Sequence, residues 1–563
     1  MTVLNSHKGP SNTPQMPNEL HSNDFRLLGI LNRKITVRYL HDASAPADMH
    51  ELAVAAQAAF EAHDFAVAYR FMTRLLLRHR GFEINEATEV ATALDFKLDR
   101  RLLVPGDPLT ITLEPILVLE SPPRNKFTAT FVLRDRAGRM EEALPSIAVQ
   151  EMRTYRVPVE TSTLAAGRHS IVYKLHGPDG RSLVECPRDF VVDPDARHHL
   201  HQLEDRFRRL EPENKSGQPI AITSARETIE FVLMQMSLAL KSYHAAMNHK
   251  SFPMTIKLRG VDMARYDNDP FESARDLPLV ESLVSDLEVG RDPFSTRTGD
   301  MRLAFRSQLD GELQPFRVFV PEARQHSAKL PAVIALHGAT GDENTYFDRY
   351  SEPKTGQNLF KKLGQEFGFL LAAPNGRGPF GMYTGNSERD VLETLDRVQA
   401  LFPIDRQEIF LTGHSMGGMG TWSLGFRYAD RFAALAPVAG RPGDLVIPLL
   451  DQAPEKPVLF VAGLNDVIVT PAKTSEWARI AQRHLKHFEY REYPRDDHFS
   501  IGLSSMPAIF EFFDAQRGPP SFSPPWQGGA GGGRRHRVNL RMTDRLEGAG
   551  ERRGVSPTSS KQQ

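Results

Sequence analysis

The fold of this chain is decided by the stretch Glu408-Ile409-Phe410-Leu411-Thr412-Gly413-His414-Ser415-Met416-Gly417-Gly418. Its apolar half predicts a strand, Gly-His-Ser-Met-Gly predicts a tight turn, and residues 419–428 are compatible with a helix. A serine on such a turn has a strained backbone, so Gly413 and Gly417 are needed to let strand and helix approach. We expect the Ser415 hydroxyl at the carboxyl end of a parallel sheet, with the Met416 N–H aimed at a developing oxyanion. The alternative is a glycine-rich turn with an incidental serine.

Short apolar runs alternate with helix-like segments around this stretch. The runs are nearly continuous in apolar residues, which is typical of strands buried on both faces. They are residues 332–336, 369–373, 409–411, 433–436 and 458–462, and the helix-like segments are residues 356–366, 387–402 and 473–485. Residues 301–320 predict a β-hairpin ahead of them. The fold class expected for residues 300–516 is therefore α/β, with a mostly parallel, doubly wound sheet.

A serine hydroxyl is a weak nucleophile at neutral pH and needs a base, which in turn needs a group that orients it. Asp466 directly follows the predicted strand 458–462, and His498 follows the predicted last strand, 488–493. Both should therefore lie at the same edge of the sheet as Ser415. The order Ser, Asp, His along the chain is that of α/β-hydrolases.

Other histidines and acids compete for these roles. His414 adjoins the serine but is expected to point elsewhere, and His337 comes too early in the chain. His484 and His487 have no acid that is expected to orient them. Asp444 follows the preceding strand and is the best substitute for Asp466.

A second oxyanion donor is expected from the loop His337-Gly338-Ala339-Thr340-Gly341 after an early strand. Gly338 would allow close approach of the backbone, and the Ala339 N–H would then point at the substrate carbonyl oxygen together with that of Met416.

These motifs resemble the α/β-hydrolase esterases that are related to polyhydroxybutyrate depolymerases and to the hydrolase domain of prolyl oligopeptidases. The resemblance covers roughly residues 310–515 and rests on His337-Gly338, Pro374-Asn375-Gly376-Arg377-Gly378, Tyr383, Glu388-x-Asp390-Val391, Ile404-Asp405 and the run from Thr412 to Thr421. It implies a triad of Ser415, Asp466 and His498 and an oxyanion hole of Met416 and Ala339. One departure is Ala339-Thr340, where a run of glycines is usual in the family.

Four residues of these loops are candidates for substrate binding: His337, Gly338, Arg377 and Tyr383. Arg377 would give a cationic contact to an acidic substrate, although an arginine between two glycines is at least as often a loop residue in water.

The rest of the chain divides by its pattern. Residues 49–80 predict an amphipathic helix pair with a bend near His63-Asp64, and Ser224-x-x-Glu227 predicts a helix start. Alternating runs with Gly and Pro turns predict an immunoglobulin-like sandwich, one of them at residues 152–157, and proteins similar to this one carry such a domain before the hydrolase. The expected segments are 1–24 (disordered), 25–92 (helical), 93–195 (immunoglobulin-like β-sandwich), 196–299 (helical linker), 300–516 (α/β-hydrolase) and 517–563 (disordered basic tail).

Composition limits the remaining classes. With 69 basic and 70 acidic residues the net charge is 69 − 70 = −1, which gives no bulk attraction to nucleic acid or to an anionic membrane. The single cysteine, Cys186, excludes an intrachain disulfide, and His198-His199-x-His201 lacks the partners of a metal site. No secretory signal and no membrane-spanning run is visible, so a cytoplasmic location without a membrane partner is expected.

The expected reaction is hydrolysis of a small or medium carboxylic ester through an acyl-enzyme, with no cofactor and no metal. A prolyl oligopeptidase-like serine peptidase is the alternative, although residues 1–300 show no repeat of the kind that builds a propeller. A catalytically inactive binding or scaffold protein is the alternative of another class, and it would need a missing triad member.

Overall fold

The computed structural model describes residue 36 and residues 39–518 apart from several internal stretches. The stretches left out are 41–44, 63, 80, 116, 118, 136–139, 211–216, 242–255, 259–260, 264–272, 323–328, 340, 353–354, 379–380 and 467. The predicted disordered segments 1–24 and 517–563 lie outside the described residues, except for Arg517 and Gly518.

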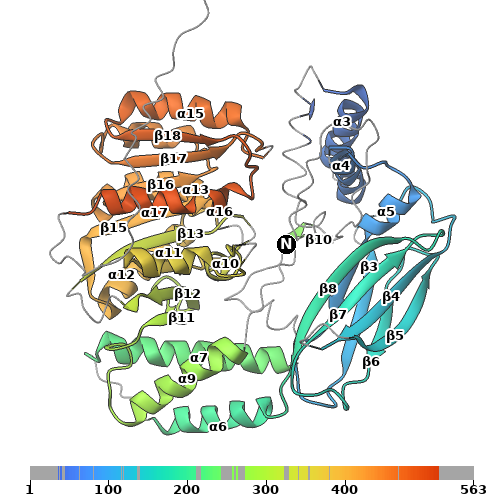
Figure 1. Ribbon diagram of the computed structural model, residues 1–563, viewed down its shortest axis with the longest axis horizontal. Coiled ribbons are helices and arrows are strands. Elements are labelled where there is room, and N and C mark those ends of the chain that lie inside the picture. The colour runs from blue at the N-terminus through green and yellow to red at the C-terminus, as the bar shows by residue number, and fades with distance from the viewer. Residues whose placement is uncertain are drawn as a thin grey trace, which may run out of the picture. The chain divides into compact units, whose positions relative to one another are not determined.

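An eight-stranded sheet forms the centre of the C-terminal half, in the order β11-β12-β14-β13-β15-β16-β17-β18 (Figure 1). The strands are β11 (Gly299–Arg306), β12 (Leu313–Val320), β13 (Leu330–Leu336), β14 (Leu370–Pro374), β15 (Ile404–His414), β16 (Ala434–Val438), β17 (Val458–Gly463) and β18 (Phe488–Tyr493). β11 and β12 form the predicted antiparallel hairpin, and β12 pairs antiparallel with β14. From β14 to β18 all neighbours are parallel.

Helices cover both faces of this sheet because its strands carry apolar side chains on both faces. On β13, Ile334 and Leu336 belong to one hydrophobic cluster, whereas Val333 and Ala335 belong to another. The first cluster packs against α12 (Asn386–Leu401), α13 (Met416–Arg427), α14 (Ile447–Leu450) and α15 (Pro471–His484), and the second against α10 (Thr345–Asp348), α11 (Leu359–Phe367), α16 (Ile501–Ser504) and α17 (Met506–Ala515). The predicted doubly wound α/β sheet is confirmed.

The parallel strands place their following segments along one edge of the sheet. This carboxyl edge carries the segments after β13, β14, β15, β16, β17 and β18, and the turn between β11 and β12 also reaches it because β12 runs antiparallel to β14. Every residue predicted for the site therefore lies in a segment at this edge.

The helices of residues 196–299 pack on the edge of this sheet. They are α6 (Ala196–Arg209), α7 (Ile220–Lys241) and α9 (Ser273–Glu288). The same range also holds the short paired strands β9 (Ile256–Leu258) and β10 (Val261–Met263). The Thr228 hydroxyl of α7 accepts the Ala304 N–H of β11 at 3.0 Å. The predicted helix start at Ser224 is wrong, because α7 begins four residues earlier and Ser224 instead accepts a hydrogen bond from Arg397 of α12.

The N-terminal half holds helices followed by two smaller sheets. The helices are α3 (Ala47–Glu61) and α4 (Phe65–His79), which confirm the predicted pair, and α5 (Glu86–Ala93). The strands are β1 (Leu94–Leu98), β2 (Leu102–Leu103), β3 (Leu109–Pro115), β4 (Phe127–Arg134), β5 (Met140–Val149), β6 (Tyr155–Val159), β7 (Gly167–His176) and β8 (Ser182–Val192), in the sheets β1-β3-β6 and β2-β8-β7-β4-β5. The strand expected at 152–157 begins three residues later, at Tyr155.

The two smaller sheets share one hydrophobic core. The Phe96 ring of β1 lies 5.9 Å from the Phe131 ring of β4 and 5.5 Å from the Tyr173 ring of β7, measured between ring centroids. Cys186 is buried on β8 in the same core. Among the helices of the described residues, none combines the length and the apolar character needed to cross a membrane.

Candidate active site

Ser415 occupies the sharp turn between β15 and α13. Its φ is 58° and its ψ is −114°, a conformation that costs a non-glycine residue free energy and that the surrounding contacts must maintain. The Ser415 N–H donates to the Val438 carbonyl of β16 at 2.9 Å. A Cβ on Gly413 would lie 2.4 Å from the Gly417 oxygen, and one on Gly417 would lie 1.9 Å from the Leu336 oxygen of β13. Both glycines are therefore required by the close approach of strand and helix.

Replacing Gly417 by Ala is expected to destabilise the protein by about 3 kcal/mol or more, because the added methyl meets backbone and has nowhere to move. Gly443→Ala is the matched control, since a Cβ there meets nothing within 4 Å and the φ of −71° suits alanine. Urea unfolding of both variants measures the difference. Equal midpoints for Gly417→Ala and the native chain would contradict the proposed contact.

The structure brings the three predicted residues together. His498 Nε2 lies 2.8 Å from Ser415 Oγ, and His498 Nδ1 lies 2.7 Å from Asp466 Oδ2. All three side chains are buried, with relative exposures of 9%, 2% and 3% for Ser415, Asp466 and His498. A base within hydrogen-bond reach of a hydroxyl, and itself bonded to a buried acid, is the arrangement that activates a serine.

The second oxygen of Asp466 fixes the direction of the carboxylate. Oδ1 accepts the backbone N–H groups of Ile468 and Val469, both at 2.8 Å, in a local turn of the kind that Asp favours. Oδ2 is thereby directed at His498. The substitute acid Asp444 lies instead in an ion pair with Arg441, with its side chain 72% exposed.

The expectation that no acid orients His484 is wrong, because His484 Nδ1 lies 2.7 Å from Asp451 Oδ1. His487 likewise lies 3.3 Å from Glu455. Both pairs lie near the start of β18, at the opposite edge of the sheet from Ser415, so neither can serve that serine.

The predicted oxyanion loop lies against the serine. A Cβ on Gly338 would be 3.4 Å from Ser415 Cβ and 3.2 Å from the His414 oxygen, so a larger residue would crowd the turn. Ala339 follows directly, and Met416 is the first residue of α13, whose N-terminus carries partial positive charge. Ala339 and Met416 thus both lie beside the serine turn.

His337 and Tyr383 support this loop from beneath. Both side chains are fully buried. The Tyr383 hydroxyl donates to the His337 carbonyl at 3.0 Å, and the His337 ring faces the carbonyl oxygens of Gly338 and Asn375. Burial lowers the pKa of His337, and the contacts with the two carbonyl oxygens oppose that shift. These placements change the role that we propose for both side chains from substrate contact to positioning.

Arg377 is bound within the protein. Its Nε lies 2.8 Å from Asp390 of α12, and its Nη2 donates to Ser307 at 2.8 Å in the turn between β11 and β12. It also pairs with Asp310 in that turn. The guanidinium therefore ties this turn to α12, and we do not propose it as a cationic contact to substrate.

His414 is a site residue that the sequence analysis set aside. Its ring lies beside that of His498, with 5.0 Å between the centroids, and its Nε2 donates to the His498 carbonyl at 2.6 Å. As expected, this ring nitrogen is directed away from the serine hydroxyl, whose partner is His498, but the contact with His498 was not predicted. Only the tertiary fold brings residues 414 and 498 together, so no local pattern could have shown this contact.

His414 is expected to make the protein less stable in acid. Burial, reinforced by the charge of His498, lowers the pKa of His414 to about 4, against 6.5 ordinarily. Between these two pH values His414 is protonated in the unfolded chain but not in the folded one. The contribution of His414 to the free energy of unfolding is therefore complete above about pH 6.5 and is lost as the pH falls to 4. The loss is ~3 kcal/mol. Urea unfolding at several pH values should show a shallower acid slope for His414→Gln.

Asp390 is the control for His414, because its contribution to stability should change with pH in the opposite direction. Burial raises the pKa of this carboxyl to about 7 from 3.8, with Arg377 opposing the shift. The folded state then binds the extra proton between pH 3.8 and 7, so this contribution to stability grows as the pH falls. Asp390→Asn should therefore lose stability in acid more steeply than the native chain. If stability depends on pH with the same slope in His414→Gln and Asp390→Asn, the proposed pKa shifts of both residues are contradicted.

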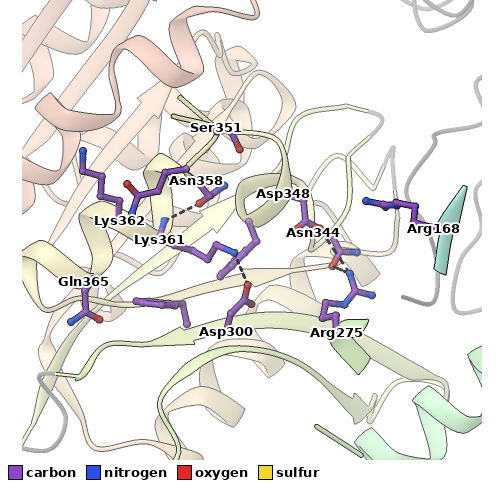
Figure 2. A pocket seen from close by; sticks show the side chains of 14 residues that line it. Arg168, Arg275, Asp300, Asn344, Asp348, Ser351, Asn358, Lys361, Lys362 and Gln365 are labelled. Atoms are coloured by element: carbon purple, nitrogen blue, oxygen red, sulfur yellow. Dashed lines mark hydrogen bonds and ion pairs between the residues drawn. The ribbon is translucent and has the colours of Figure 1, made fainter. Parts of the chain in front are cut away.

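A polar cavity of about 850 Å³ is separate from these residues (Figure 2). Its lining includes Asp300, Asn344 and Lys361, and Lys361 Nζ donates to Asp300 at 2.8 Å. Ser415, Asp466 and His498 do not line it. In the part of the chain that the structure describes, no group of three or more His, Cys, Asp or Glu residues is placed to hold a metal ion.

Comparison with known proteins gives partial similarities. No protein-family model matches the chain. It is 30% identical over 144 residues to a bifunctional acetylxylan esterase/xylanase of Neocallimastix patriciarum, and the matched segment covers 25% of this chain and 20% of the relative. It is 28% identical over 147 residues to poly(3-hydroxyalkanoate) depolymerase C of Paucimonas lemoignei, and this second matched segment covers 23% of this chain and 32% of the relative. The chain thus spans a third or less of the length of these relatives.

Among solved structures, similarity is found to a fluorophosphonate-binding serine hydrolase of Staphylococcus aureus, with a TM-score of 0.34, 20% identity and coverage of 39% of this chain and 99% of that one. A ferulic acid esterase of Anaeromyces mucronatus gives a TM-score of 0.33, 16% identity and coverage of 40% and 94%. Both are hydrolases. At TM-scores this low the likeness carries no information on substrate.

Proposed function

We propose that the chain is a serine hydrolase that cleaves carboxylic esters through an acyl-enzyme. The observation that carries this proposal is the hydrogen-bonded series from Ser415 through His498 to Asp466. The partial similarity to an acetylxylan esterase and to a polyhydroxyalkanoate depolymerase supports ester hydrolysis. In the proposal, residues 300–516 are the catalytic α/β-hydrolase domain, and residues 93–195 are the immunoglobulin-like domain before it.

In the first step, Ser415 Oγ attacks the carbonyl carbon of the ester. His498 Nε2 takes the hydroxyl proton, and the carbonyl electron pair moves onto its oxygen. When that pair returns, the bond to the alcohol breaks, and the alcohol leaves with the proton from Nε2. The acyl group is then bonded to Ser415 Oγ.

In the second step, water replaces the alcohol. His498 Nε2 takes a proton from water as the water oxygen attacks the acyl carbon. Collapse of this intermediate releases the carboxylic acid and returns the proton to Ser415 Oγ. Asp466 holds Nδ1–H of His498 in both steps, so that Nε2 is free to accept a proton, and it stabilises the imidazolium.

The negative oxygen that forms in each step is stabilised by the backbone N–H groups of Met416 and Ala339. One such donor typically contributes about 3 kcal/mol to lowering the barrier. Gly338, His337 and Tyr383 hold the loop of Ala339 in place. The named residues handle every proton and electron pair, so the proposed steps include no cofactor.

The test compares the two substrate classes on the full chain. A fluorophosphonate probe should label the native chain once, and the chain should hydrolyse p-nitrophenyl esters with a higher kcat/KM than peptide p-nitroanilides. Faster cleavage of the anilides would favour the serine peptidase instead. If the chain is not labelled and hydrolyses neither class of substrate, the inactive scaffold becomes the better assignment.

A further inference from the structure

Exposed apolar side chains gather at the edge of the sheet that carries Ser415. Within the described residues, eight large hydrophobic side chains are more than a third exposed. Four of these lie in segments that follow β14, β16, β17 and β18: Met382, Leu445, Leu464 and Phe499. Leu445 is the most exposed, at 91%. Exposed apolar side chains in segments beside a functional site suit contact with an apolar group.

The order of the strands places these four side chains on both sides of the serine. Ser415 follows β15, which lies between β13 and β16. Met382 follows β14 on one side, whereas Leu445, Leu464 and Phe499 follow the successive strands β16, β17 and β18 on the other side. Leu309, in the turn between β11 and β12, lies at the far end of this edge. Val54, Ile220 and Val289 belong to the helical segments and are not part of this group.

Each of the four segments is connected to the candidate site by a contact or by direct neighbourhood in the chain. The Phe499 ring lies edge-on to that of His498, with 5.6 Å between the centroids. Leu464 precedes Asp466 by two residues, and Met382 precedes Tyr383, which holds the His337 loop. The segment of Leu445 leaves β16 through Gly440, where a Cβ would lie 2.6 Å from the Ser415 oxygen. Each of the four segments therefore contains or adjoins a residue that lies in or against the candidate site.

We infer that Met382, Leu445, Leu464 and Phe499 form an apolar rim that binds the acyl group of the substrate. The inference rests on the proposed function and names its substrate class: esters of uncharged acyl groups longer than acetyl. The acyl group stays bonded to Ser415 through both steps, so side chains around this serine contact it throughout. Each methylene that it buries against the rim raises kcat/KM.

The test varies only the acyl group. p-Nitrophenyl acetate, butyrate and hexanoate share one leaving group, so the ratio of kcat/KM for hexanoate to that for acetate measures the effect of the acyl group. The native chain should give a ratio of about ten or more. Leu445→Ser combined with Leu464→Ser should lower that ratio about tenfold, since both side chains are exposed and their replacement leaves the core intact.

Val289→Ser is the control, because it removes an exposed apolar side chain that directly follows α9 and lies outside the rim. This variant should keep the native ratio. A native preference for acetate, or an unchanged ratio in the double variant, would overturn the rim. Hydrolysis that depends on Ser415 would still support the proposed function in that case. Absence of such hydrolysis for all three esters would instead overturn the proposed function, and the rim with it.

Discussion

Replacing Ser415 by Ala is expected to lower kcat for p-nitrophenyl esters by at least about 10⁴-fold and to abolish fluorophosphonate labelling. The reason is that the acyl group can bond only to the Ser415 oxygen. The oxyanion donors and the bound substrate would remain, so a small residual rate over water is expected. Initial rates on each ester measure the loss.

Ser475→Ala is the control for this substitution. Ser475 is a partly exposed serine of α15 whose hydroxyl donates to the Ala472 carbonyl, and its loss should leave the rates within twofold of native. Circular dichroism should show both variants folded. Ester turnover at the native rate by Ser415→Ala would refute Ser415 as the nucleophile.

Replacing Asp466 by Asn is expected to lower kcat by about 10⁴-fold while the fold persists. Ile468 and Val469 donate their N–H groups to Oδ1, and they should keep the amide oxygen of asparagine in that place. The amide NH₂ would then face His498 Nδ1, which must accept from it and place its own proton on Nε2. In that tautomer Nε2 cannot take the proton from Ser415.

Asp444→Asn makes the same chemical change on the neighbouring strand segment. Asp444 is exposed and pairs with Arg441, so its replacement should leave kcat near native. Rates measured across pH 6–9 for both variants separate the two acids. A larger loss in Asp444→Asn than in Asp466→Asn would transfer the role of orienting acid to Asp444.

The sequence could predict the sheet and the serine turn because both depend on local pattern. Apolar runs such as 458–462 are typical of strands that a covered parallel sheet buries on both faces. Glycine is required two residues before and two residues after Ser415, at Gly413 and Gly417, because strand and helix approach closely there. Asp466 and His498 could be chosen because each follows a strand whose end must lie at the same edge.

The supporting contacts could not be predicted because they join segments far apart in the chain. The bond from His414 to the His498 carbonyl spans 84 residues, and that from Tyr383 to His337 spans 46. Arg377 stood between glycines and gave no sign of its partner Asp390 or of the hairpin turn. Such pairings follow from the packing of helices and strands, which no short motif encodes.

The contact between α7 and β11 sets a limit on where the chain can be cut. β11 is the outer strand of the eight-stranded sheet, and α7 covers it through the bond from Ala304 to Thr228 and the ion pair of Arg306 with Glu230. A recombinant fragment that starts at residue 300 would leave this strand open to pairing with other copies, which favours aggregation. A fragment that starts at residue 196 retains the cover, and should therefore be soluble with the eight-stranded sheet intact.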